Sequence, residues 1–165
     1  MMRSIPVLLC TILFLGLGSC TTPSVEGNLC QRTFMPYPDL NPNRIGNRQN
    51  DLFIDGMIAY NDKDYAGAVE KLKPFVMKRN SDRSAQLYLA CSYLALNKPY
   101  DAELALDHVE NGNLGQYKDE AEWFTVVCWV CSDQLDRARS GAKKIADRKH
   151  TYQQQAADLL SELGS

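Results

Sequence analysis

The chain has 165 residues, with 18 basic and 20 acidic side chains, a formal net charge of −2 and a hydrophobic fraction of 45%. This balance excludes the basic excess that nucleic-acid binding requires, while the hydrophobic fraction is sufficient for a packed core. The length beyond a short leader corresponds to one domain.

Residues 1–19 have the features of a signal peptide. Arg3 gives a positive start, and the apolar run from Ile5 to Gly18 is too short to span a bilayer comfortably. The following Leu17-Gly18-Ser19-Cys20 resembles the bacterial lipobox, which implies cleavage before Cys20 and acylation of its thiol. We therefore expect a lipid anchor at Cys20; the alternative is an ordinary secretory signal that leaves a free thiol. Thr21, where aspartate would favour the inner membrane, favours the outer membrane and its periplasmic side.

Residues 20–49 are predicted to form a flexible, lipid-anchored tether. They contain Pro23, Pro36, Pro38 and Pro42, and no helical or strand period runs through them. The segment 34–38 (Phe-Met-Pro-Tyr-Pro) is apolar for a linker. Two interpretations stay open for it: packing onto the folded domain, or a short recognition segment.

From Asp51 onward the pattern is helical throughout. Apolar stripes at helical spacing, separated by short polar turns, predict seven helices in chain order. The expected helices cover residues 52–60, 65–79, 84–96, 99–110, 120–131, 137–148 and 151–163.

Two stretches of this helical region repeat 34 residues apart. Small and large apolar residues recur in register, as the pairs Gly56 and Ala90, Ala68 and Ala102, Leu72 and Leu106, and Phe75 and Val109. The pattern resembles the tetratricopeptide repeat. The resemblance implies an all-α fold: a short right-handed α-solenoid of three helix pairs over residues 50–165. The repeats fall at about 49–82, 83–116 and, after a two-residue slip, 119–152, with a capping helix at 151–163.

In this family the first helix of each pair lines a concave groove that binds a partner's helix or peptide. Transferred to this chain, the groove positions are mainly apolar and aromatic, and such a surface should be covered. They are Phe53, Met57, Tyr60, Asn61, Leu87, Cys91, Leu94, Trp123, Val127 and Cys131. Three covers stay open: the chain's own tether or last helix, a partner segment, or a second copy of the chain.

The cysteines beyond Cys20 allow several interpretations. Cys91, Cys128 and Cys131 are expected on neighbouring helices, so a disulfide from Cys91 to Cys128 or Cys131 is conceivable; buried reduced thiols are the favoured interpretation. A thiol-redox function of Cys128 and Cys131 is a remote alternative, because the pair lies near a helix C-terminus. No metal site is predicted, since too few ligands converge.

These features together predict a protein that is not an enzyme and needs no cofactor. The chain contains no phosphate-binding loop and no nucleophile elbow. We expect a membrane-anchored scaffold or adaptor of the bacterial envelope whose partners are other envelope proteins. A structural subunit of a larger envelope assembly is the alternative.

Overall fold

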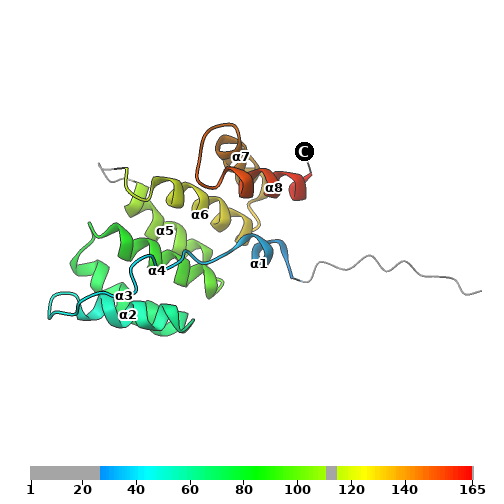
Figure 1. The fold of residues 1–165 in the computed structure, drawn as a ribbon. Coiled ribbons are helices and arrows are strands. Elements are labelled where there is room, and N and C mark those ends of the chain that lie inside the picture. Colours follow the sequence, from blue (N-terminus) through cyan, green and yellow to red (C-terminus); the bar gives the residue numbers. More distant parts are fainter. Residues whose placement is uncertain (1–26, 111–114, 165) are drawn as a thin grey trace, which may run out of the picture.

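The computed structural model describes residues 27–110 and 115–164, which form eight helices and no strand (Figure 1). The helices are α1 (Leu29–Thr33), α2 (Asp51–Asn61), α3 (Tyr65–Lys78), α4 (Arg83–Ala95), α5 (Pro99–Glu110), α6 (Lys118–Cys131), α7 (Leu135–Ala146) and α8 (Gln153–Leu163). Among these described helices, none has the length and apolarity needed to cross a bilayer. The expected signal peptide and the acylated Cys20 lie outside the described residues.

The seven helices expected from the sequence are confirmed as α2 to α8, with ends that differ by one or two residues. Local chemistry explains where they begin. Asp64 caps α3 by accepting a hydrogen bond from the Gly67 N–H at 2.9 Å, and Asp82 caps α4 in the same way. Pro99 occupies the first position of α5, where the missing N–H is not needed.

The turns inside the three successive helix pairs share one backbone conformation. Lys63, Asn97 and Asp133 each adopt the left-handed conformation, with φ between 56° and 62°. In each turn the next residue's N–H donates to the carbonyl five residues earlier, as in Asp64 to Ala59 at 2.8 Å. The same turn thus recurs at the places where the sequence repeat places it.

The small residues of the repeat lie where two helices approach closely. A Cβ on Gly56 would come within 2.8 Å of the Leu72 side chain, so α2 could not pack on α3 at this distance with a larger residue. Ala68, Ala90 and Ala102 are fully buried. Gly56 is thus a close contact between two helices, and the three alanines lie in the core.

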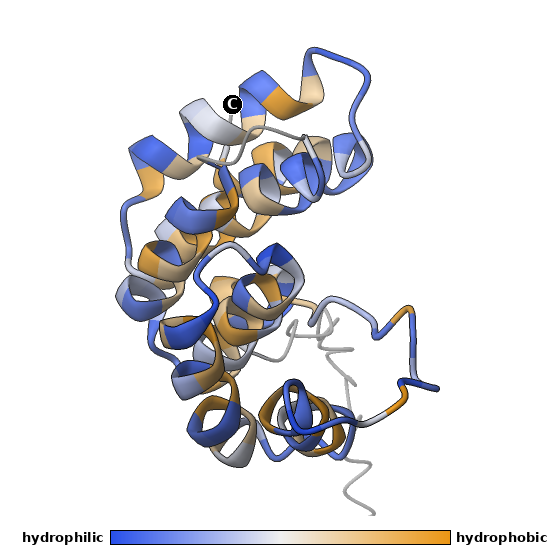
Figure 2. Cartoon of the chain, turned by 90° about the vertical axis from the view of Figure 1, so that its left-hand side faces the viewer, coloured by the Kyte–Doolittle hydropathy of each residue, from blue (hydrophilic) through white to orange (hydrophobic). Residues whose placement is uncertain are grey.

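Neighbouring helices from α2 to α8 pack against one another in sequence order, so the all-helical class is confirmed. Hydrophobic residues gather where the helices face each other (Figure 2). The last helix, α8, packs on α7 and buries Ala156 and Leu159. It therefore covers an apolar face that α7 would otherwise expose.

The boundary predicted at residues 49–50 is too late, because the folded body begins near Asn28. Asn28 caps the short helix α1, and α1 packs on α6, far along the chain. Residues 34–44, which we call the strap, then run past α4 towards α2 (Figure 1). Part of the predicted tether is thus held on the domain, where Phe34 and Tyr37 of the apolar segment pack on the core.

Candidate functional site

The predicted groove residues lie together in the core, and the strap covers part of them. Eight of the ten are buried, namely Phe53, Met57, Tyr60, Leu87, Cys91, Leu94, Trp123 and Val127. The other two have partners: Asn61 donates to Asp39 of the strap at 2.9 Å, and Cys131 forms a disulfide. These side chains therefore do not form an open groove in this structure.

Tyr37 is the centre of the strap and the only one of its residues that is buried. Its ring lies edge-on to Tyr117 and Phe124 and is tilted against Tyr88, with centroid separations of 5.9 to 6.5 Å. Burial, with the nearby Glu120 carboxylate, raises the pKa of Tyr37 well above its usual value. The phenol therefore stays neutral, and the ring serves as an anchor.

Two tyrosines from the helices hold the strap's backbone. Tyr60 donates from its hydroxyl to the Tyr37 carbonyl at 2.7 Å, and Tyr88 donates to the Pro38 carbonyl at 3.3 Å. The Cys91 thiol also faces the Tyr37 backbone. These bonds satisfy carbonyls that would otherwise be covered without a partner.

An ion pair between two strap residues lies at the other end of the strap. Arg44 contacts Asp39 at 2.7 Å, and their side chains are only 14% and 5% exposed. The guanidinium also lies 5.1 Å from the centre of the Phe53 ring, a cation–π distance. Burial opposes ionisation of Asp39, but hydrogen bonds from Arg44 and Asn61 outweigh it and hold the pKa of Asp39 below its usual value.

A disulfide between Cys30 in α1 and Cys131 at the end of α6 joins positions 101 residues apart. The pairing of Cys91 with Cys128 or Cys131 was therefore wrong. Because α1 packs on α6, Cys30 lies against the end of α6 and bonds with Cys131. Cys91 and Cys128 are left as free, buried thiols. Burial raises the pKa of the Cys91 thiol to about 12 and raises that of Cys128 as well, so neither is a ready nucleophile.

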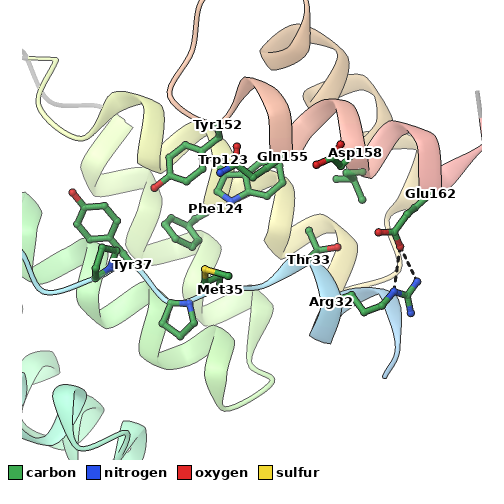
Figure 3. Close-up of a pocket in the computed structure, with 13 residues that line it drawn as sticks. Arg32, Thr33, Met35, Tyr37, Trp123, Phe124, Tyr152, Gln155, Asp158 and Glu162 are labelled. Atoms are coloured by element: carbon green, nitrogen blue, oxygen red, sulfur yellow. Dashed lines mark hydrogen bonds and ion pairs between the residues drawn. The ribbon is translucent and has the colours of Figure 1, made fainter. Parts of the chain in front are cut away.

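A cleft of about 320 Å³ remains open between the strap, α6 and α8 (Figure 3). Aromatic rings contribute to its lining: Trp123 stacks on Tyr152 at 5.7 Å, and Phe124 lies edge-on to Tyr152. The full lining is Arg32, Thr33, Met35, Pro36, Tyr37, Pro38, Trp123, Phe124, Tyr152, Gln155, Asp158, Leu159 and Glu162.

The rim of this cleft is polar. Arg32 in α1 pairs with Glu162 in α8 at 2.8 Å, which ties the two walls together at one end. Gln155 and Asp158 are exposed along α8, while Met35 on the strap is 78% exposed. An apolar floor with a few polar groups at the edge is the usual composition of a ligand-binding cleft. Trp123 is thus the predicted groove residue that still borders open space here.

Two further hollows lie outside the strap. One, about 240 Å³, is formed by α3, α4 and α5, and the other, about 640 Å³, by α5, α6 and α7. The residues that α4 and α5 give to the first hollow have counterparts 36 positions later in the second, for example Tyr93 with Trp129 and Leu104 with Ser140. The interval is the 34-residue repeat with the two-residue slip. They are two versions of the same hollow, produced by the repeat.

Several important residues were missed from the sequence. Cys30, Tyr37, Asp39 and Arg44 all lie in the segment assigned to the tether, and Tyr88 lies on α4 beside the predicted groove residue Leu87. A tyrosine between two prolines in an otherwise polar linker was the available signal. Its partners lie on α2, α4 and α6 and at Tyr117 just before α6, so they could not be read from local pattern.

No metal cluster of His, Cys, Asp or Glu occurs among the described residues. No protein-family model matches the chain, and neither a curated protein nor a solved structure matches it. The functional argument therefore depends on the residues and their geometry.

Proposed function

We propose that this protein is a lipid-anchored interaction module of the bacterial envelope, built as a short tetratricopeptide-like solenoid. The signal-like residues 1–19, followed by Cys20, support the anchor and a periplasmic location at the outer membrane. The repeated turns and the small residues at helix contacts support the family resemblance.

The observation that carries the interaction function is the open cleft beside the strap. Most of the other predicted groove residues are covered by the chain itself, whereas Trp123 borders this open cleft. About 320 Å³ accommodates one or two large side chains rather than a whole helix. A partner would therefore place an apolar anchor residue over Trp123 and Tyr152, with its polar groups against Gln155 and Asp158.

The test is a crosslinking capture from the bacterial envelope. The cleft variant carries Met35→Lys and Gln155→Lys, which place a charge on each wall of the cleft. The matched control carries Ile45→Lys and Gln154→Lys, two exposed positions close to the same segments but outside the cleft lining. All four are surface changes, so both variants should fold like the wild type.

We expect the cleft variant to lose partners that the wild type and the control both retain. A partner set that is the same in all three proteins would contradict docking at the cleft. Loss of the same partners from both variants would show a general effect of added charge.

A structural subunit of a larger envelope assembly is the second candidate. The exposed apolar side chains on the α3–α5 side, Met77 (77%), Tyr100 (67%) and Leu104 (63%), favour it. In that case the purified protein would associate through this side and the cleft variant would keep its partners.

A further inference from the structure

The strap is bound to the helices as a separate extended ligand would be. Its contacts are one buried ring, two backbone carbonyls held by Tyr60 and Tyr88, and the carboxylate of Asp39 held by Asn61. Domains that capture extended peptides use this combination of a side-chain pocket and backbone hydrogen bonds. None of these contacts requires that the segment belong to the same chain.

The strap's own sequence specifies what the site accepts. Pro36 and Pro38 flank Tyr37 and favour the extended backbone, which lowers the entropy lost on binding. The ring enters a pocket formed by Tyr88, Tyr117 and Phe124. Asp39, after Pro38, completes the recognition, since one of its carboxylate oxygens accepts a hydrogen bond from Asn61.

One contact is beyond the reach of a competing segment, namely the Cys30–Cys131 disulfide. Together with the chain connection to α2, it fixes the strap at both ends and keeps its effective concentration high. Both cysteines are only half-buried, and Cys131 also lines a surface hollow beside Pro99 and Tyr100, so a reductant can approach. A dithiol would give two electrons and two protons, leaving two thiols here and a disulfide in the reductant.

We propose that the strap is a tethered occupant of a binding site for a partner's extended segment, a tyrosine between two prolines followed by an acidic residue, and that reduction of Cys30–Cys131 opens this site. The inference deepens the interaction function proposed above and depends on it, but it uses neither the lipid anchor nor the cleft. After reduction the strap remains connected to α2, so a partner competes with a weakened occupant rather than with an empty site.

The probe is a fluorescent peptide with the sequence of residues 31–41, and the control peptide carries Ala in place of Tyr37 and Lys in place of Asp39. The host protein is the chain from residue 20 with Cys20→Ser, Cys30→Ser and Tyr37→Gly, so that its own strap is neither latched nor anchored. Fluorescence anisotropy measures binding, and circular dichroism checks that the host is folded. The same chain with the wild-type Cys30 and Tyr37, tested with and without a dithiol, provides the comparison.

We expect saturable binding to the folded host, at least tenfold tighter for the strap peptide than for the control peptide. The oxidised protein with the wild-type strap should exclude the peptide. The same protein after reduction should bind the peptide more weakly than the host does. A folded host that binds neither peptide, or both equally, would overturn the proposal. Reduced protein that forms dimers and ignores the peptide would overturn it too, by assigning the site to a second copy.

Hydrogen exchange provides an independent measurement if the host variant does not fold. In the wild-type chain, reduction should speed up amide exchange between residues 30 and 37 at least tenfold more than it speeds up exchange in α4, where the change reports only the general loss of stability. Equal exchange before and after reduction would show that the disulfide is no latch. If these tests fail and the cleft variant does lose partners, the proposed function stands without the strap site. If the peptide binds and the cleft variant keeps its partners, docking at the cleft is wrong and the strap site is the interaction site.

Discussion

The face covered by the strap and the two hollows outside it differ, although α4 and α6 contribute to both. On the strap face, Phe53, Tyr60 and Tyr88 are buried and each contacts a strap residue. In the hollows, side chains at matching positions have diverged: Leu104 corresponds to Ser140 and His108 to Lys144. Helix packing is the same in both repeats, but among the described residues the strap face is covered by a segment of the chain itself, which makes that face part of the core.

The largest expected effect comes from removing the strap's anchor. Tyr37→Ala deletes a buried ring that packs against three other aromatic rings, and such truncations cost about 3–5 kcal/mol. Met77→Ala, at a residue that is 77% exposed in the α3–α5 hollow, should stay within about 0.5 kcal/mol of the wild type.

Denaturant unfolding measures both variants, and the slope of the free energy against denaturant shows whether the same surface is exposed. If Tyr37→Ala costs no more than Met77→Ala, the strap is a surface attachment and the difference between the two faces disappears. A lower slope for Tyr37→Ala alone would show that the strap is already detached in the folded variant.

The helices were predictable because their signals are local. Asp64 before Gly67, Pro99 at a helix start and the spacing of Ala68, Leu72 and Phe75 each act within one or two turns of the chain. The 34-residue repeat added the order in which the helices pack. The family resemblance also selected side chains that lie together, although eight of the ten proved to be buried.

The strap could not be placed from the sequence for the opposite reason. A segment rich in proline has no period that identifies a packed face, and the partners of Tyr37 lie 23 to 87 positions further along the chain. Likewise Cys30 finds Cys131 only because α1 docks on α6, and α1 is a five-residue helix without a strong signal of its own. The open cleft follows from the strap's position, so it too required the structure.

Removing the disulfide should have the second largest effect. It closes a loop of 101 residues, and bonds of this kind stabilise proteins by about 2–4 kcal/mol, chiefly by restricting the unfolded chain. Cys30→Ser combined with Cys131→Ser should lower the free energy of unfolding by this amount. The wild type in a dithiol should agree with the double variant within about 0.5 kcal/mol, and a disagreement would mean that serine itself disturbs the site. No loss in either sample would contradict a latched strap.

The smallest expected effect concerns the ion pair that closes the strap near α2. Because the pKa of Asp39 is lower in the folded state than in the unfolded chain, its contribution to stability is present above the unfolded pKa and is lost as pH falls through the folded pKa. Asp39→Asn should cost on the order of 1.5 kcal/mol at neutral pH, since charge-assisted hydrogen bonds from Arg44 and Asn61 are weakened.

The pH dependence separates this contribution from simple loss of packing. As pH falls below the ordinary pKa of aspartate, the wild type should lose stability towards the level of Asp39→Asn, so that the two curves converge. Asp55→Asn, at an exposed position on α2, is the matched control for the removal of one carboxylate. Curves for Asp39→Asn and the wild type that stay a constant distance apart would show that the carboxylate's charge does not hold the strap. The strap would then be held by its aromatic anchor, its backbone hydrogen bonds and the disulfide.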